Sequence, residues 1–199
     1  MALKENDEIT VKINVDIEEF YKILKVKGYN IVNKFTMDDS YFIPNNLDIS
    51  NMSIRDILSK AILTRYIVDN IPNDKIYQMI TYKKKDITPE GVILGQESIN
   101  CYVENIEQAK KLIKAIGYIE IMNIKENDLV YEKDGIQLCI KDIIDGDNLV
   151  EVETKYNEEY NTVEKIKEKL IKENLPIDLK NLYIKKAEIE LNKRLKREG

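Results

Sequence analysis

Acidic, hydroxyl and basic side chains alternate with apolar residues near the start of the chain, in a spacing that could form a binding site. In the segment EITVKINVD, from Glu8 to Asp16, every second residue is apolar, which is typical of a strand with two unlike faces. Glu8, Thr10 and Lys12 fall on the polar face. Carboxylates suit Mg²⁺ or Mn²⁺ and ammonium groups suit phosphate, so this face either meets water or lines a site for charged ligands.

The same alternation returns in four later segments, QESINCYV, MITYKKK, GIQLCIKD and LVEVE. Their polar positions include Lys83, Gln96, Ser98, Asn100, Lys141, Glu151 and Glu153. A β-sandwich would turn such faces to water, whereas a barrel with helices packed outside would turn them inward. Arg65 lies in the apolar segment AILTRYIV, where a buried guanidinium without a partner would be costly.

Composition excludes several classes of chemistry. The 199 residues include no histidine, which excludes Ser-His-Asp and Cys-His triads, histidine-bound zinc and imidazole acid-base catalysis. With 7 glycines, the chain has no Gly-rich phosphate loop either. Chemistry must therefore rest on carboxylates, lysines, arginines, tyrosines or a metal held by oxygen ligands.

Charge and hydropathy narrow the partners and the compartment. The net charge of -5 argues against broad nucleic-acid binding. No apolar run reaches the roughly 18 residues of a membrane span, and MALKENDEIT lacks the apolar core of a secretory signal. We therefore expect a cytoplasmic protein without nucleic-acid or membrane partners. Cys101 and Cys139 lie in predicted strands and are expected to be buried free thiols.

The remaining pattern predicts strands interrupted by a few helices in a single domain over 1–199. Helical spacing favours helices near 16–28 and 105–118, and two more in the tail at 162–174 and 179–195. The segment NMSIRDILSK is expected to be a loop or a short turn, and Asp134-Gly135 predicts a tight hairpin. Strands are expected within 1–155, and C-terminal helices within 156–199.

One stretch of the chain is echoed later. IEEFYKILKVKGY (17–29) aligns with IEQAKKLIKAIGY (106–118) at an offset of 89 residues. Both copies follow a predicted strand and precede another. Either amphipathic helices simply look alike, or the fold consists of two strand-helix-strand halves related by a pseudo-twofold axis.

Five segments, in order, resemble the CYTH superfamily, whose members are also called triphosphate tunnel metalloenzymes. EITVK resembles the family's Glu-x-Glu-x-Lys strand, and DSYFIP its Asp-x-Tyr-Phe-Asp-x-Pro segment. AILTRYIV resembles a Leu-Arg-x-Arg strand, and ITYKKK resembles Leu-Thr-Tyr-Lys-Gly. YEKDGIQLCIKDIIDGDNLVEVE resembles the closing hairpin and final Glu-x-Glu strand. The resemblance implies an α+β fold: an antiparallel eight-stranded β-barrel, or tunnel, with helices packed outside and a helical C-terminal tail.

The resemblance also implies a site, with departures. It implies metal binding by Glu8, Glu151 and Glu153, and phosphate binding by Lys12, Arg65, Lys83 and Lys125. Other tunnel-lining positions are Thr10, Gln96, Ser98, Asn100 and Lys141. Thr10 stands where the second glutamate belongs, Leu63 replaces the first arginine, and Lys141 stands where an aspartate is usual. Gln96, Ser98 and Asn100 stand in place of Arg-x-Glu-x-Glu. No residue is assigned as catalytic.

Three functions remain open at this stage. The first is binding of a triphosphate-bearing ligand with Mg²⁺ or Mn²⁺ by a triphosphatase-like hydrolase or an adenylyl-cyclase-like enzyme. The ligand would be a nucleoside triphosphate, thiamine triphosphate or inorganic polyphosphate. The second is a catalytically inactive tunnel that binds or senses a phosphate ligand, which the missing glutamates favour. The third is a structural protein with a vestigial tunnel, and a homodimer is left open in each case.

Overall fold

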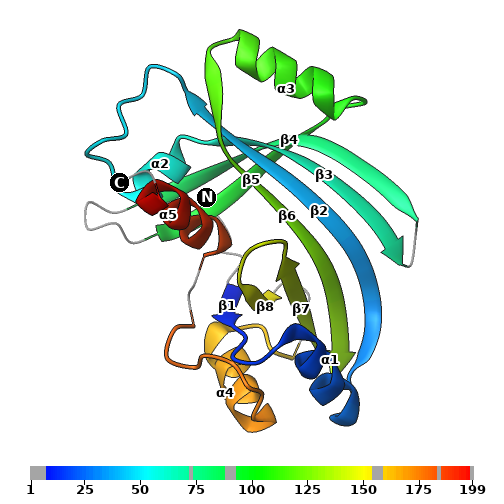
Figure 1. Ribbon diagram of the computed structural model, residues 1–199. Helices are drawn as coiled ribbons and strands as arrows, with labels where there is room; N and C mark the ends of the chain where they lie inside the picture. The colour runs from blue at the N-terminus through cyan, green and yellow to red at the C-terminus, as the bar shows by residue number, and fades with distance from the viewer. Residues whose placement is uncertain (1–7, 72–73, 88–92, 154–158, 183–184, 198–199) are drawn as a thin grey trace.

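The structure is a computed structural model that describes residues 8–71, 74–87, 93–153, 159–182 and 185–197 (Figure 1). Its strands are β1 (Glu8–Lys12), β2 (Asn30–Pro44), β3 (Ile62–Ile71), β4 (Lys75–Ile87), β5 (Ile93–Tyr102), β6 (Tyr118–Lys133), β7 (Ile136–Ile143) and β8 (Asn148–Glu153). Its helices are α1 (Ile17–Val26), α2 (Ile54–Ser59), α3 (Ile106–Ala115), α4 (Val163–Glu173) and α5 (Lys186–Arg197).

All eight strands form one antiparallel sheet in the order β1-β8-β7-β6-β2-β3-β4-β5. The long strands β2 and β6 pair at its centre and bend along its length (Figure 1). Exchanging β1 with β5, β2 with β6, β3 with β7 and β4 with β8 reproduces the same order in reverse. The sheet therefore has pseudo-twofold topology.

The internal echo fits this symmetry. Helices α1 and α3 span equivalent residues at the offset of 89, and Asp16 and Asn105 cap their N-termini. Each helix is followed by a glycine at positive φ, Gly28 at 86° and Gly117 at 94°, which L-residues adopt at a cost. The sheet order and these matching caps support two related halves over a chance likeness of helices.

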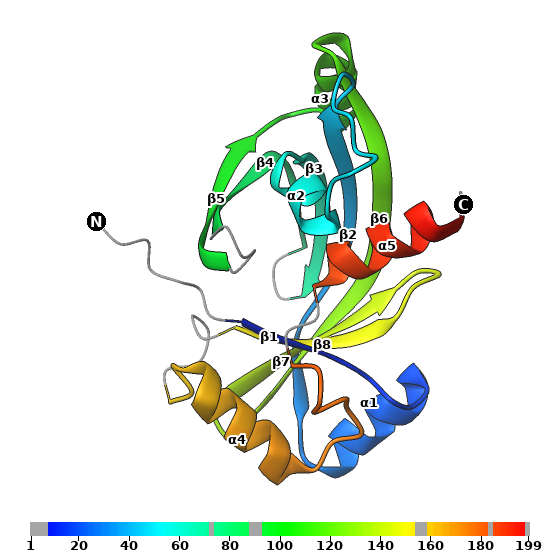
Figure 2. The same ribbon diagram turned by 90° about the vertical axis from the view of Figure 1, so that its left-hand side faces the viewer.

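A first apolar core lies on the outer face of the sheet. Ile9 and Val11 of β1, with apolar residues of β7 and β8, point away from the polar face and are fully buried. Phe20 of α1 and Ile166 of α4 pack against them. The apolar faces of these alternating strands are thus buried beneath α1 and α4 (Figure 2). The expectation that helices pack outside the tunnel is confirmed for these two helices.

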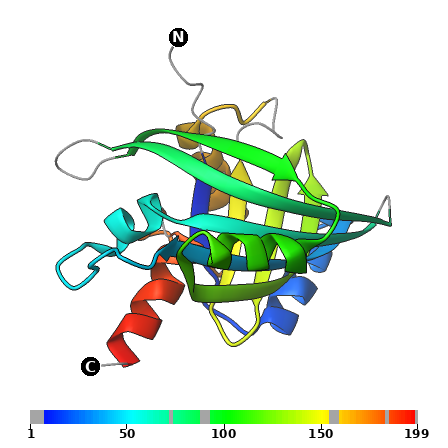
Figure 3. The ribbon, with the colours of Figure 1, turned by 90° about the horizontal axis from the view of Figure 1, so that it is seen from above.

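A second apolar core lies on the inner face of the sheet at one end. Its members Leu63, Ile143 and Leu149 are each two residues from Arg65, Lys141 and Glu151 and so share their faces. Helices α2 and α5 contact each other and cover this end (Figures 2 and 3).

The segment expected to be a loop or short turn contains helix α2 instead. The Ser53 side chain accepts a hydrogen bond from the Asp56 N–H and caps its N-terminus. Ile57 and Leu58 bury its apolar side in the second core. Tertiary packing therefore stabilises a helix of six residues that is too short to form alone.

Within the described residues, no ladder joins β1 to β5. The outer edge of β1 is covered by residues 176–182 instead. Thr10 and Asn14 donate backbone hydrogen bonds to Leu182 and Pro176, and the Asp178 N–H donates to the Lys12 carbonyl. This segment occupies the groups that a neighbouring strand would use. The expected eight antiparallel strands and tunnel-like shape are confirmed, and residues 176–182 cover the outer edge of β1.

Two smaller expectations can be checked. Cys139 is a half-buried free thiol, whereas Cys101 is free but exposed, so the prediction that it is buried was wrong. Cys101 belongs to β5, a strand with a single described neighbour at the edge of the sheet. Among the helices that the structure describes, none is long and apolar enough to cross a membrane.

Candidate functional site

The inner face of the sheet encloses a cavity of about 720 Å³. Polar residues line it from β1, β3, β4, β5, β7 and β8, together with the first residues of α5. Seven of the residues predicted from the sequence line it: Thr10, Arg65, Lys83, Ser98, Lys141, Glu151 and Glu153. The inward orientation of the polar faces is therefore observed for most of the described strands.

The remaining predicted residues lie elsewhere. Lys12 Nζ pairs with Asp147 Oδ1 at 2.6 Å, and its side chain is 48% exposed. The Lys125 side chain is 56% exposed, and its Nζ lies 3.7 Å from Asp38 Oδ2. Because Lys125 precedes Glu126 on β6, it points to the opposite face of the strand, away from the cavity. Asn100 accepts a hydrogen bond from Thr81 at 2.8 Å without lining the cavity. The side chains of Glu8 and Gln96 lie outside the described residues.

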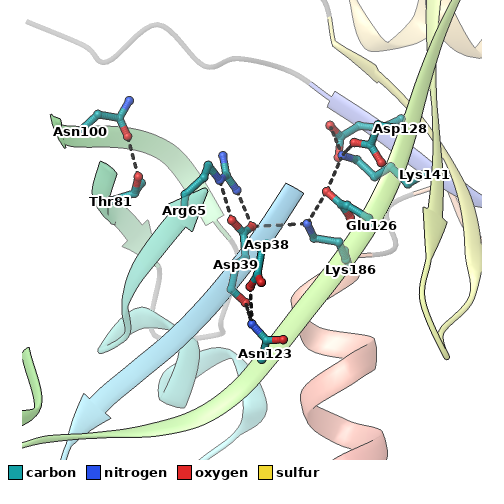
Figure 4. Close-up of polar contacts among 11 residues, drawn as sticks. Asp38, Asp39, Arg65, Thr81, Asn100, Asn123, Glu126, Asp128, Lys141 and Lys186 are labelled. Atoms are coloured by element: carbon teal, nitrogen blue, oxygen red, sulfur yellow. Dashed lines mark hydrogen bonds and ion pairs between the residues drawn. The ribbon is translucent and has the colours of Figure 1, made fainter. Parts of the chain in front are cut away.

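Arg65 is held in one orientation by a buried carboxylate. Its Nε and Nη2 donate to Asp39 Oδ1 and Oδ2 at 2.8 and 2.7 Å, and Asp39 is fully buried (Figure 4). Strand pairing explains this fork, because Asp39 on β2 lies directly opposite Arg65 on β3. Neither hydrogen bond uses Nη1, and the side chain is 20% exposed toward a cavity that it lines.

Lys186, at the start of α5, joins this pair to a second group of charges. Its Nζ lies 2.8 Å from Glu126 Oε1 and 3.5 Å from Asp39 Oδ2. Helix α5 can place it there because Leu191 anchors that helix in the inner core. The ammonium thus bridges carboxylates on two neighbouring strands, β2 and β6.

Lys141 of β7 lies among three carboxylates. Its Nζ is 3.2 Å from Asp128 Oδ2, 3.5 Å from Glu126 Oε1 and 3.6 Å from Glu151 Oε1. Asp128 is directly opposite it on β6, as Asp39 is opposite Arg65. The result is a continuous buried network that runs from Arg65 to Lys141 (Figure 4).

The network shifts the pKa values of its members. Burial raises the pKa of Asp39, but Arg65 and Lys186 outweigh it and hold that pKa well below its usual range. Burial also opposes the charge of Glu126, yet Lys141 and Lys186 lower its pKa. Burial raises the pKa of Asp128 to about 7, with Glu126 adding to the rise and Lys141 opposing it. Burial alone would lower the pKa of Lys141. Its three carboxylates outweigh burial and raise this pKa well above its usual value, so Lys141 stays charged.

Comparison with known proteins decides the fold. No family model and no curated protein sequence matches the chain. Among solved structures, the PH1819 protein from Pyrococcus horikoshii superposes with a TM-score of 0.64 at 15% identity, covering 94% of this chain and 99% of the other. A candidate adenylate cyclase from Vibrio parahaemolyticus gives 0.56 at 11%, covering 97% and 99%. A candidate adenylyl cyclase from Hippeastrum, described as having a dominant triphosphatase activity, gives 0.54 at 13%, covering 90% and 91%. The chain has a CYTH-like tunnel fold.

The CYTH-like tunnel contains four charged residues to which sequence reasoning assigned no role: Asp39, which is the first residue of the DSYFIP segment, and Glu126, Asp128 and Lys186. Two signals could have found the aspartates. The Asp134-Gly135 turn sets a register in which Asp128 lies opposite Lys141. The same offset of 89 residues, applied to the strands that follow the two helices, aligns Asp39 with Asp128. The packing of α5 against the tunnel, which brings Lys186 inward, left no comparable signal.

The resemblance implies Mg²⁺ or Mn²⁺ in the tunnel, and the described donors can be tested against it. Within the part of the chain that the structure describes, no three potential ligands converge as a metal site. Three carboxylates of the tunnel, those of Glu126, Asp128 and Glu151, instead surround the Lys141 ammonium. Arranged in this way, they do not fit a divalent cation. The expectation of a metal stays a prediction.

Proposed function

We propose that this chain binds a triphosphate-bearing anion inside the tunnel and acts as a binding or sensor module. The observation that carries the proposal is the Arg65 guanidinium, which lines the cavity and is oriented by its fork with Asp39. A guanidinium held in place loses little freedom when it binds a phosphate oxygen, and planar donors suit phosphate geometry.

Size and charge of the cavity support this ligand class. A volume of about 720 Å³ lies within the range of roughly 300–1,000 Å³ typical of small-molecule sites. Lys83 of the neighbouring strand β4 also lines the cavity, four residues along the strand from Met79, the partner of Arg65. Lys141, Lys185 and Lys186 line it as well. Five cationic residues therefore line the cavity beside four acidic ones, Asp69, Glu151, Glu153 and Glu188, and the cations can offset part of the charge of a polyphosphate chain.

The buried network supports binding over turnover. Of the glutamates that the resemblance implies as metal ligands, Glu151 is engaged by Lys141, and the buried carboxylates next to it, Asp128 and Glu126, are engaged by Lys141 and Lys186. Metal-assisted phosphoryl transfer requires carboxylate or water oxygens on the ion. The tunnel therefore suits recognition of the anion better than its hydrolysis.

Calorimetric titration with tripolyphosphate and with ATP tests the proposal on the full chain. Lys83→Gln should weaken binding about tenfold or more, because a charge-assisted hydrogen bond to phosphate contributes on the order of 1.5–3 kcal/mol. Lys125→Gln is the matched control, because Lys125 lies on the outer face of β6 and should leave affinity unchanged. Equal losses in both variants, or no binding by the wild type at millimolar ligand, would reject the proposal.

A metal-dependent triphosphatase is the second candidate, and adenylyl-cyclase-like chemistry is its variant. The activity described for the Hippeastrum relative and the position of Glu151 and Glu153 on the cavity wall favour it. Phosphate release from tripolyphosphate or ATP would be measured with Mn²⁺, with Mg²⁺ and with EDTA. Metal-dependent release that Glu153→Gln abolishes would favour the enzyme, and its absence from both substrates would favour the binding module.

A further inference from the structure

We propose that the Lys141 ammonium takes the place of a divalent cation in this tunnel, so that the polyanion is bound as the free, metal-uncomplexed species. The statement about the ligand rests on the proposed function, whereas the statement about the metal does not. Both follow from the surroundings of Lys141.

The first argument is position. Lys141 Nζ lies within 3.2–3.6 Å of carboxylate oxygens from Glu126, Asp128 and Glu151, and its side chain is only 6% exposed. A Mg²⁺ or Mn²⁺ ion shared by these carboxylates would need their oxygens at about 2.0–2.2 Å around the same point. The ammonium fills that point, so the ion and Lys141 exclude each other by volume as well as by charge.

The second argument is charge balance. The three carboxylates are shared by two ammonium groups, Lys141 and Lys186, and Lys186 also reaches Asp39. Asp128 keeps one buried oxygen, Oδ1, without a hydrogen bond from the described residues. Across the whole network, the three cations Arg65, Lys141 and Lys186 face the four carboxylates of Asp39, Glu126, Asp128 and Glu151, so the charges are already close to balance before any metal arrives. A divalent ion would add unbalanced charge to a buried site.

The third argument concerns the ligand. In a tunnel where metals bridge carboxylates and phosphates, a metal-bound anion is the species that fits. Here Glu126, Asp128 and Glu151 are engaged by ammonium groups, and the cavity wall also carries the cationic side chains of Arg65 and Lys83, which can face a phosphate chain. Mg²⁺ on the ligand would compete with these cations for the same oxygens.

Two titrations test the inference on the full chain. Free Mn²⁺, followed by electron paramagnetic resonance, should remain free with the wild type up to about 1 mM. Lys141→Met should bind Mn²⁺ at least about tenfold more tightly, because three carboxylates lose their internal cation. Lys125→Met, which removes a lysine outside the cavity, should not. Tripolyphosphate should bind the wild type in EDTA at least as tightly as in excess Mg²⁺.

The outcomes are separable. A wild-type Mn²⁺ site that Glu151→Gln removes would overturn the inference, and so would tripolyphosphate binding that EDTA abolishes. This first measurement needs no Lys141 variant, so it decides the question even where Lys141→Met fails to fold by circular dichroism. If tripolyphosphate binds in neither buffer, the proposed function fails, while the Mn²⁺ titration still decides whether Lys141 replaces the metal.

Discussion

At the scale of single residues, the tunnel is defined by pairs of opposite charge instead of isolated cations. Lys141 was predictable as an inward-facing residue because period-two alternation assigns it a face, whereas Arg65 was singled out because a guanidinium in an apolar strand needs a partner. Their buried partners were not predictable, because Asp39 and Asp128 lie in segments whose polar and apolar residues do not alternate cleanly. What a charged residue does in this tunnel therefore depends on the strand opposite it.

Asp128 makes a prediction about pH. Its folded-state pKa of about 7 lies above the usual aspartate value of 3.8, so the folded form binds this proton more tightly than the unfolded chain. The resulting stability is complete below about pH 4 and is lost as pH rises through about 7. From pH 5 to pH 8, the free energy of unfolding should fall by roughly 1–3 kcal/mol.

Urea unfolding of the wild type and of Asp128→Asn at pH 5, 6, 7 and 8 measures this effect. The variant should show a nearly flat profile, because an amide imitates the protonated carboxyl. The chain has no histidine to mask the change. Asp39 and Glu126 have lowered pKa values, so their contribution is complete above the unfolded values near pH 4 and constant in this window. Parallel profiles for the two proteins would contradict the assignment.

At the scale of elements, local signals predicted most of what was found. Helices α1, α3 and α4 and the β6–β7 hairpin follow from caps, spacing and the Asp134-Gly135 turn, whereas α5 begins at Lys186 and the predicted helical residues 179–182 are not helical. Helix α2 was missed because its six residues carry too short a pattern and depend on packing for stability. That α2 and α5 cover the inner end of the tunnel could not be predicted, because an amphipathic pattern does not say which surface it meets.

The turns that set the strand register give a prediction with two opposite signs. Gly135 has φ +73°, so Gly135→Ala should destabilise the protein by about 1 kcal/mol or more, because L-residues are strained there. Asp145 already adopts φ +60° as a non-glycine residue, so Asp145→Gly should be neutral or slightly stabilising. Urea midpoints measure both, and a destabilising Asp145→Gly would show that its side chain, and not its backbone, matters.

At the scale of the whole molecule, the sheet has two unlike edges. Residues 176–182 cover β1, whereas β5 has β4 as its single described neighbour. The sequence predicted the strands but not the pairing of residues 176–182 with β1, because pairing between residues distant in the chain leaves no local pattern. The C-terminal segment thus pairs with backbone groups on the outer edge of β1, as an additional strand would.

Hydrogen exchange should reveal this difference between the edges. Peptides covering β5 (93–102) should exchange faster than those covering β6 (118–133), because β6 has a strand on each side. Amides of β1 should resemble β6, since Thr10 and Asn14 donate to the C-terminal segment. Mass spectrometry of pepsin fragments measures all three regions at once. Equal protection of β5 and β6 would mean that the far edge is covered too.

The pseudo-twofold topology makes each half of the molecule an internal reference for the other. Asp39 and Asp128 occupy equivalent positions, 89 residues apart, each opposite a cation on the next strand. Their backbones are alike, yet the pKa of one carboxyl is lowered and that of the other is raised. Asp39→Asn removes the partner of a guanidinium, and Asp128→Asn removes the partner of an ammonium that other carboxylates share. Because the strand pairing is alike at both positions, the two substitutions compare these two kinds of counter-ion within one polypeptide.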